Sequence, residues 1–152
     1  MIATKEELEA AARKDVNYEI AKAQAALTLL AGSTPGTDEA HFYLEGFILH
    51  FRNLFHFLYD TPSQDDIVAG HYIQGWEQSR PPAPPGLEEA KKRAHKMLAH
   101  LTFSRLHLPP NWDIQGIWSD LLSVLTVFFV GLSEEQKNWF PKLREISGSM
   151  GS

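Results

Sequence analysis

The sequence lacks several features that would assign the protein to a familiar class. It contains no cysteine, which excludes disulfide bonds and thiolate sites and fits a reducing cytoplasm. No basic segment followed by an apolar run stands near the N-terminus, so we expect no signal peptide. The longest uncharged apolar run, from Leu121 to Leu132, is shorter than the roughly 20 residues of a membrane helix. We therefore expect a cytoplasmic protein without membrane contact.

The motifs of common nucleotide and metal chemistry are also missing. There is no glycine-rich phosphate loop, no G-x-S-x-G segment, no dinucleotide fingerprint and no H-E-x-x-H pair. Nucleotide hydrolysis by those routes is not expected, and we predict no cofactor. The net charge of −5 argues against nucleic-acid binding over the whole surface.

The apolar residues are spaced as in helices. They recur at helical intervals from Leu8 to Leu30, from Tyr43 to Leu58, from Leu87 to Leu101 and from Ile114 to Leu132. Capping boxes are expected at Thr4–Glu7, Ser63–Asp66 and Ser133–Gln136. We predict an all-α fold, an up-and-down four-helix bundle with two short extra helices. Residues 1–146 would form the single domain, and residues 147–152 a flexible tail.

A proline-rich segment, SRPPAPPG, precedes the third predicted helix. Consecutive prolines hold a chain extended, so the segment can serve as a spacer of defined reach or as a ligand for an SH3-type domain. We favour the spacer, because such segments most often connect two elements.

Positive charge is concentrated on the third predicted helix. Between Ala90 and Trp112 there is no acidic residue, whereas the basic side chains there are Lys91, Lys92, Arg93, Lys96 and Arg105, with His95, His100 and His107. Arg93 and His100 are about 20° apart around this helix and about 10.5 Å apart along it. Such a pair suits metal-free RNA cleavage, with His100 as general acid or base and Arg93 as phosphate clamp. The alternative is a solvated basic helix face with no catalytic role.

The segment from Arg93 to His100, RAHKMLAH, resembles the R-x(4-6)-H motif of the HEPN superfamily. The strings GFILHFRNLFHFLYD, DDIVAG and RAHKMLAHLTFSR are similar to a family of uncharacterised bacterial helical proteins, over about residues 40–105. The HEPN resemblance implies a compact helical homodimer, frequently an RNase of a toxin or defence system with a possible antitoxin partner. It implies catalytic roles for Arg93 and His100, which would face their counterparts across a dimer cleft.

A second group of polar side chains lies along the second predicted helix. His41, Glu45, Arg52 and His56 fall within about 60° of one another. They can form a polar network in which Glu45 pairs with Arg52, or they can ligate a metal together with a residue from another helix. A third alternative joins both groups into one anion-binding cleft. The candidate ligand-binding residues are Lys96, Arg52, His56 and Glu45.

Three hypotheses for the function follow. The first is a HEPN-like bacterial protein that binds RNA or another phosphate-bearing ligand, with metal-independent RNA cleavage as its candidate activity. The second is a non-catalytic homodimeric protein-interaction module, and the third is a metal-binding four-helix bundle.

Overall fold

The computed structural model describes residues 2–99 and 112–150, and every regular element within these ranges is a helix. The predicted all-α class is therefore confirmed for this part of the chain. The longer elements are α1 (Lys5–Ala11), η1 (Ala12–Val16), α2 (Asn17–Ala31), α3 (Asp38–Tyr59), α5 (Pro85–Ala99), α6 (Ile114–Val130) and α8 (Pro141–Met150). The shorter ones are η2 (Ala69–His71), α4 (Trp76–Ser79) and α7 (Glu134–Lys137). Within the described ranges, no helix has the length and apolar character needed to cross a membrane.

The first three elements form one continuous helix interrupted by a π-helical turn, η1. Buried residues at its centre follow one another at four-residue intervals: Ala12, Val16 and Ile20. In a regular α-helix this spacing makes the apolar face drift by about 40° per step. A π turn holds more residues per turn, so it keeps these side chains directed at the core.

The C-terminal segment is tethered to η1 and its flank. Arg13 Nη1 donates to the carbonyl oxygen of Asn138 at 3.0 Å. The side-chain oxygen of Asn17 accepts from the backbone N–H of Lys142 at 2.9 Å, close to the first residue of α8. These two bonds thus tie the chain around the start of α8 to the π turn and to the first residue of α2.

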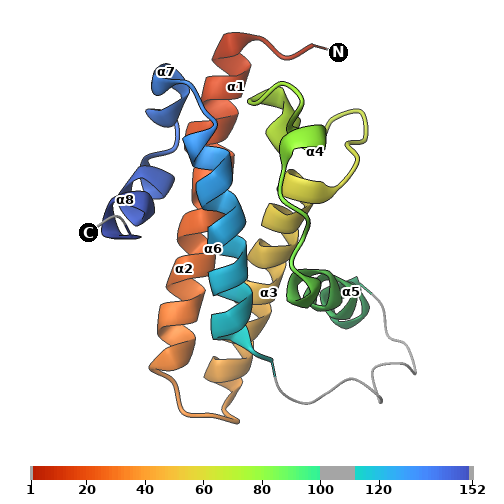
Figure 1. Cartoon of the computed structure of the whole chain (residues 1–152). Coiled ribbons are helices and arrows are strands. Elements are labelled where there is room, and N and C mark those ends of the chain that lie inside the picture. The colour runs from red at the N-terminus through yellow and green to blue at the C-terminus, as the bar shows by residue number, and fades with distance from the viewer. Residues whose placement is uncertain (1, 100–111, 151–152) are drawn as a thin grey trace.

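The long helices run side by side, with one exception. In Figure 1, α2 and α3 lie antiparallel, α6 runs beside them, and α5 is seen nearly end-on because it crosses the others. Helix α5 packs on α3 and α6, and α8 packs on α2 and α6. This arrangement leaves the predicted up-and-down bundle unconfirmed, because the direction of α5 differs from that of the other three helices.

One continuous core connects these helices. The largest fully buried side chains come mainly from α3 and α6, and they include Phe47, Phe51, Leu54, Leu58, Leu121, Leu125 and Phe128. Helix α5 contributes the small stripe Leu87, Ala90 and Ala94. Because two of these three residues are alanines, α5 can approach its neighbours closely while its charged side chains emerge on either side.

Several local predictions are confirmed at the helix ends. Thr4 and Ser133 form the predicted capping boxes with Glu7 and Gln136. The Asp113 carboxylate accepts from the Gly116 N–H at 3.0 Å and caps α6.

Other local details differ from the predictions. Asp66 accepts hydrogen bonds from the backbone and hydroxyl of Ser63, but a turn follows in place of a helix. Helix α8 continues to Met150, four residues into the segment predicted as a tail, since buried Leu143 and Ile146 fix its preceding turns. Residues 100–105 of the third predicted helix lie outside the described residues.

The proline-rich segment is anchored to the end of α3. The carbonyl oxygen of Leu58 accepts from Trp76 Nε1 at 2.8 Å and from Arg80 Nη1 at 3.1 Å. The Tyr59 hydroxyl donates to the carbonyl oxygen of Pro81 at 3.0 Å. These bonds favour the spacer interpretation, because they bind the segment along the protein between α4 and α5.

We predict that Tyr72→Phe lowers the free energy of unfolding by about 1 kcal/mol. Tyr72 is 5% exposed, and its hydroxyl donates to the carbonyl oxygen of Leu8 at 2.8 Å, just before η1. Urea unfolding followed by circular dichroism measures the change. Tyr18→Phe is the control, because Tyr18 is 50% exposed, and it should stay within about 0.5 kcal/mol of the wild type. Equal stability of all three proteins would contradict the prediction.

Candidate functional site

The charged side chains of α5 are divided between two hollows next to α3 and one cleft next to α6. Lys91 and His95 border the hollows next to α3, whereas Arg93 borders the cleft next to α6. Lys92 and Lys96 lie between them and line both sides. This division follows from the 100° step of the helix, which places Arg93 about 200° from Lys91.

The cleft between α5 and α6 has a volume of about 710 Å³ and contains the predicted catalytic arginine. The Arg93 guanidinium carbon lies 3.9 Å from the centroid of the Trp112 ring, a cation–π contact. Burial lowers the pKa of Arg93 from its ordinary value. Three cationic side chains, Lys92, Arg93 and Lys96, line this cleft together with three acidic ones, Glu89, Asp113 and Asp120. The formal charges of the described lining residues are therefore balanced.

The predicted partner of Arg93 is not placed by the structure. His100 lies outside the described residues, so the convergence of Arg93 and His100 on one phosphate stays a prediction. What the structure adds is that the Arg93 guanidinium is held against an aromatic ring in a cleft.

We define the α3–α5 groove as two adjoining hollows of about 530 and 410 Å³ between the end of α3, the proline-rich segment and α5. Asp60, Lys91 and His95 border both hollows. The remaining lining residues are Arg52, Asn53, Phe55, His56, Tyr59, Arg80, Glu88, Lys92 and Lys96.

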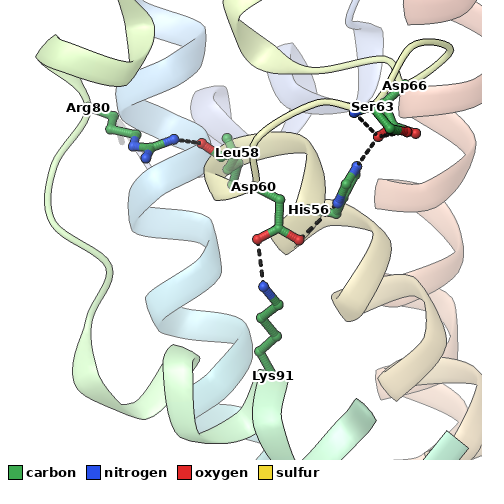
Figure 2. A network of polar contacts seen from close by, with 7 residues as sticks. All are labelled: His56, Leu58, Asp60, Ser63, Asp66, Arg80 and Lys91. Carbon is green, nitrogen blue, oxygen red and sulfur yellow. Dashed lines mark hydrogen bonds and ion pairs between the residues drawn. The ribbon is translucent and has the colours of Figure 1, made fainter. Parts of the chain in front are cut away.

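A network of charged side chains crosses this groove (Figure 2). The Asp60 carboxylate accepts from Lys91 Nζ at 2.6 Å through one oxygen and contacts His56 Nδ1 at 2.8 Å through the other. The second ring nitrogen of His56 lies 3.1 Å from the Asp66 carboxylate. Asp60 is thus shared between α3 and α5, and both ring nitrogens of His56 are held in place.

The two carboxyls of this network have lowered pKa values. Burial by itself raises the pKa of Asp60, but hydrogen bonds from Lys91 and His56 and their positive charge outweigh it. For Asp66, the hydrogen bonds from the backbone and hydroxyl of Ser63 are the main cause, with a smaller contribution from His56. Both side chains are therefore carboxylates in neutral solution.

The α3–α5 groove is electropositive although the chain as a whole carries −5. Among the residues that the structure describes, its lining contains five lysine and arginine side chains but two carboxylates, Asp60 and Glu88. Cationic side chains gathered around a hollow focus the local field and attract anions. The geometry therefore favours this groove over the charge-balanced α5–α6 cleft as an anion-binding site.

The structure brings some of the predicted ligand-binding residues together and leaves others apart. Arg52, His56 and Lys96 all line the α3–α5 groove. Glu45 is exposed on α3, does not line the groove, and makes no ion pair with Arg52 among the described residues. The predicted Glu45–Arg52 pair is therefore wrong for this part of the chain, since seven residues separate the two side chains by about 10.5 Å along the helix.

The metal-binding hypothesis gains no support from the described ranges. Within them, no three histidine, aspartate or glutamate side chains are arranged to hold a metal ion. His56, the one member of the predicted stripe with two carboxylate neighbours, uses both ring nitrogens for them.

Sequence reasoning missed several groove residues. Asp60 follows His56 by four residues, a spacing that places the two side chains on one helix face and was available from the sequence. Lys91 and His95 show the same spacing on α5. By contrast, the approach of Tyr59 and Arg80 depends on the path of the proline-rich segment, which no local pattern reveals.

Comparison of the chain with models of protein families, with curated proteins and with solved structures gives no match. The resemblance to HEPN proteins thus depends on the motif residues alone.

We predict that Asp60→Asn lowers stability near neutral pH by about 1 kcal/mol, because the amide cannot carry the charge that Lys91 and His56 face. The folded-state pKa of Asp60 lies below its ordinary value of 3.8, so its contribution is present above that value. It is lost as the pH falls through the folded-state pKa, where the carboxylate takes up a proton. The difference from the wild type should therefore disappear in acid. Urea unfolding over a pH series measures it.

Asp65→Asn is the matched control, because Asp65 is exposed on the loop beside the network. It removes the same charge and should change stability by less than about 0.5 kcal/mol. A difference for Asp60→Asn that persists unchanged in acid would show that packing, and not the charge of Asp60, causes it.

Proposed function

We propose that the protein binds RNA or another phosphate-bearing ligand through the basic side chains of α5, with the α3–α5 groove as the main contact. The observation that carries this proposal is the excess of cationic side chains in a groove of an acidic protein. Nucleic-acid backbones present a row of negative charges to which such a groove is complementary.

The arrangement of the groove supports this function chemically. Arg52 comes from α3 and Lys91 from α5, so an anion between the helices would meet cations on both sides. A guanidinium binds two phosphate oxygens at once, whereas an ammonium acts as a point charge. Asp60 keeps Lys91 at the groove, and an incoming phosphate would share that lysine with the carboxylate.

Catalysis by Arg93 and His100 is a second part of the proposal, and it requires that an RNA strand bound in the groove also pass over α5, because Arg93 lines the α5–α6 cleft. His100 would take the proton of a ribose 2′-hydroxyl or give one to the leaving oxygen, while Arg93 would stabilise the charge that grows on the phosphate. The cation–π contact between Arg93 and Trp112 supports the clamp role, because it holds the guanidinium in the cleft. The reaction would require no metal ion.

The assembly that we propose is a HEPN-like homodimer in the cytoplasm, built from up-and-down four-helix bundles and open to an antitoxin or another protein partner. In such a dimer, two Arg93 side chains would face each other across the interface. The motif from Arg93 to His100 supports this arrangement.

The second candidate function is a non-catalytic homodimeric interaction module. One observation favours it: Phe42 is 68% exposed and Leu49 44% exposed, two turns apart on the same face of α3. Large apolar side chains on one exposed face are typical of a surface that contacts another protein.

We predict that the protein binds a labelled single-stranded RNA and that Arg52→Gln weakens this binding about three- to tenfold, through loss of one phosphate contact. Fluorescence anisotropy at several salt concentrations measures the affinity, which should fall as salt rises. Lys14→Gln is the control, because it removes the same charge from an exposed position outside the groove. An RNA affinity that does not change with salt concentration or with Arg52→Gln would contradict the assignment of the groove as the RNA-binding site.

We predict that the wild type cleaves a mixed RNA pool in the presence of EDTA and that Arg93→Ala and His100→Ala each lower the rate about 100-fold or more. Gel electrophoresis of the products measures the rate. Because Arg93 packs on Trp112, thermal unfolding must show that its variant is folded. Unchanged cleavage by both folded variants would contradict the catalytic roles of Arg93 and His100. A strictly monomeric wild-type protein would contradict the proposed dimer cleft.

A further inference from the structure

The two hollows of the α3–α5 groove differ in their chemistry. The described residues that line the smaller one are all polar or charged: Arg52, Asn53, His56, Asp60, Lys91 and His95. The larger one adds the aromatic rings of Phe55 and Tyr59, with Arg80 beside them. A ligand that fills both would have an anionic group next to a flat apolar ring.

The aromatic hollow has a rigid wall. The Phe55 and Tyr59 rings lie 5.1 Å apart between centroids and are tilted by 32°, and the Arg80 guanidinium carbon lies 5.1 Å from the Tyr59 ring centroid. Hydrogen bonds from Tyr59 to Pro81 and from Arg80 to Leu58 fix both side chains. Aromatic rings and guanidinium planes are the surfaces on which nucleobases stack.

The polar edge of the larger hollow distinguishes between aromatic ligands. Glu88, Lys92 and Lys96 border it, which supplies one carboxylate acceptor and two ammonium donors. A nucleobase carries donors and acceptors around its ring and can use such groups. A phenol ring, such as that of phosphotyrosine, has no ring donors or acceptors to match them.

We propose that the α3–α5 groove recognises a nucleotide unit, whose phosphate lies at Arg52, Lys91 and His95 and whose base lies against Tyr59 and Arg80. The unit is either a free nucleoside phosphate or one residue of an RNA strand. Hollows of about 410 and 530 Å³ fall within the range of roughly 300–1,000 Å³ typical of small-ligand sites. This inference rests on the proposed function, since it requires that the groove bind phosphate.

The test compares ligands that share a phosphate and differ in what is attached to it. Isothermal titration calorimetry of the full chain measures affinities for inorganic phosphate, ribose 5-phosphate, phenyl phosphate and the 5′-monophosphates of adenosine and uridine. We expect the nucleotides to bind about tenfold tighter than ribose 5-phosphate, which corresponds to the stacking of one base.

Two substitutions separate the halves of the groove. Tyr59→Leu should weaken adenosine monophosphate binding about tenfold and phosphate binding less than twofold, because it removes the ring but no charge. Arg52→Gln should weaken both by the same factor. If Tyr59→Leu does not fold, Arg80→Lys provides the comparison at the other side of the ring, because it removes the guanidinium plane and keeps the charge. Lys14→Gln should change neither affinity.

The outcomes distinguish this inference from the proposed function. If the nucleotides bind no more tightly than inorganic phosphate, the nucleotide assignment is overturned, whereas the proposed function is not. No binding of phosphate, nucleotide or RNA overturns both. Phenyl phosphate that binds as tightly as the nucleotides overturns the inference in favour of a phosphotyrosine-type ligand.

A further arm identifies the source of the nucleotide. A uridine trinucleotide that binds tighter than uridine monophosphate, with the gain lost in Arg52→Gln, supports one residue of an RNA strand. Equal affinities support a free nucleotide, because the groove then makes no use of the adjoining units.

Discussion

One carboxylate ties α5 to the end of α3. Asp60, the C-cap residue of α3, accepts from Lys91 across the helix crossing and at the same time holds His56. An ion pair of this kind, about one-quarter to one-third exposed, contributes modestly to stability. Together with the buried stripe of α5, it determines which side of α5 faces α3.

That orientation separates two kinds of surface on a single helix. The small buried stripe of α5 contacts α3 and α6. On one side of it, Lys91 and His95 add charge to the groove, and on the other side Arg93 packs on Trp112. The sequence of this helix is mainly basic, yet one of its sides thus lines an electropositive groove and the other lines a charge-balanced cleft. Rotation of α5 by a third of a turn would remove that division.

The sequence predicted the positions of the helices along the chain better than it predicted how the helices pack against one another. The capping boxes at Thr4 and Ser133 follow from local hydrogen bonding, which residues within one turn decide. The groove could not be predicted in this way. Lys91 and Asp60 are 31 residues apart in the sequence, and their contact depends on the angle between two helices, which the spacing of apolar residues does not determine. Spacing identified Arg52 and His56 correctly as neighbours. It paired Arg52 with Glu45 wrongly, because two side chains on one face still lie two turns apart.

The π turn at η1 allows this part of the chain to absorb a change in its own length. A π turn is equivalent to one residue added to a regular helix. Deletion of one residue there would restore α-helical winding, and the turns on either side would keep nearly the same direction, because the wide turn had taken up the extra residue. The same deletion within α2 would instead rotate everything before it by about 100°, which would move Leu8 away from the Tyr72 hydroxyl and Arg13 away from Asn138. A one-residue deletion between residues 12 and 16 should therefore be tolerated better than one within α2.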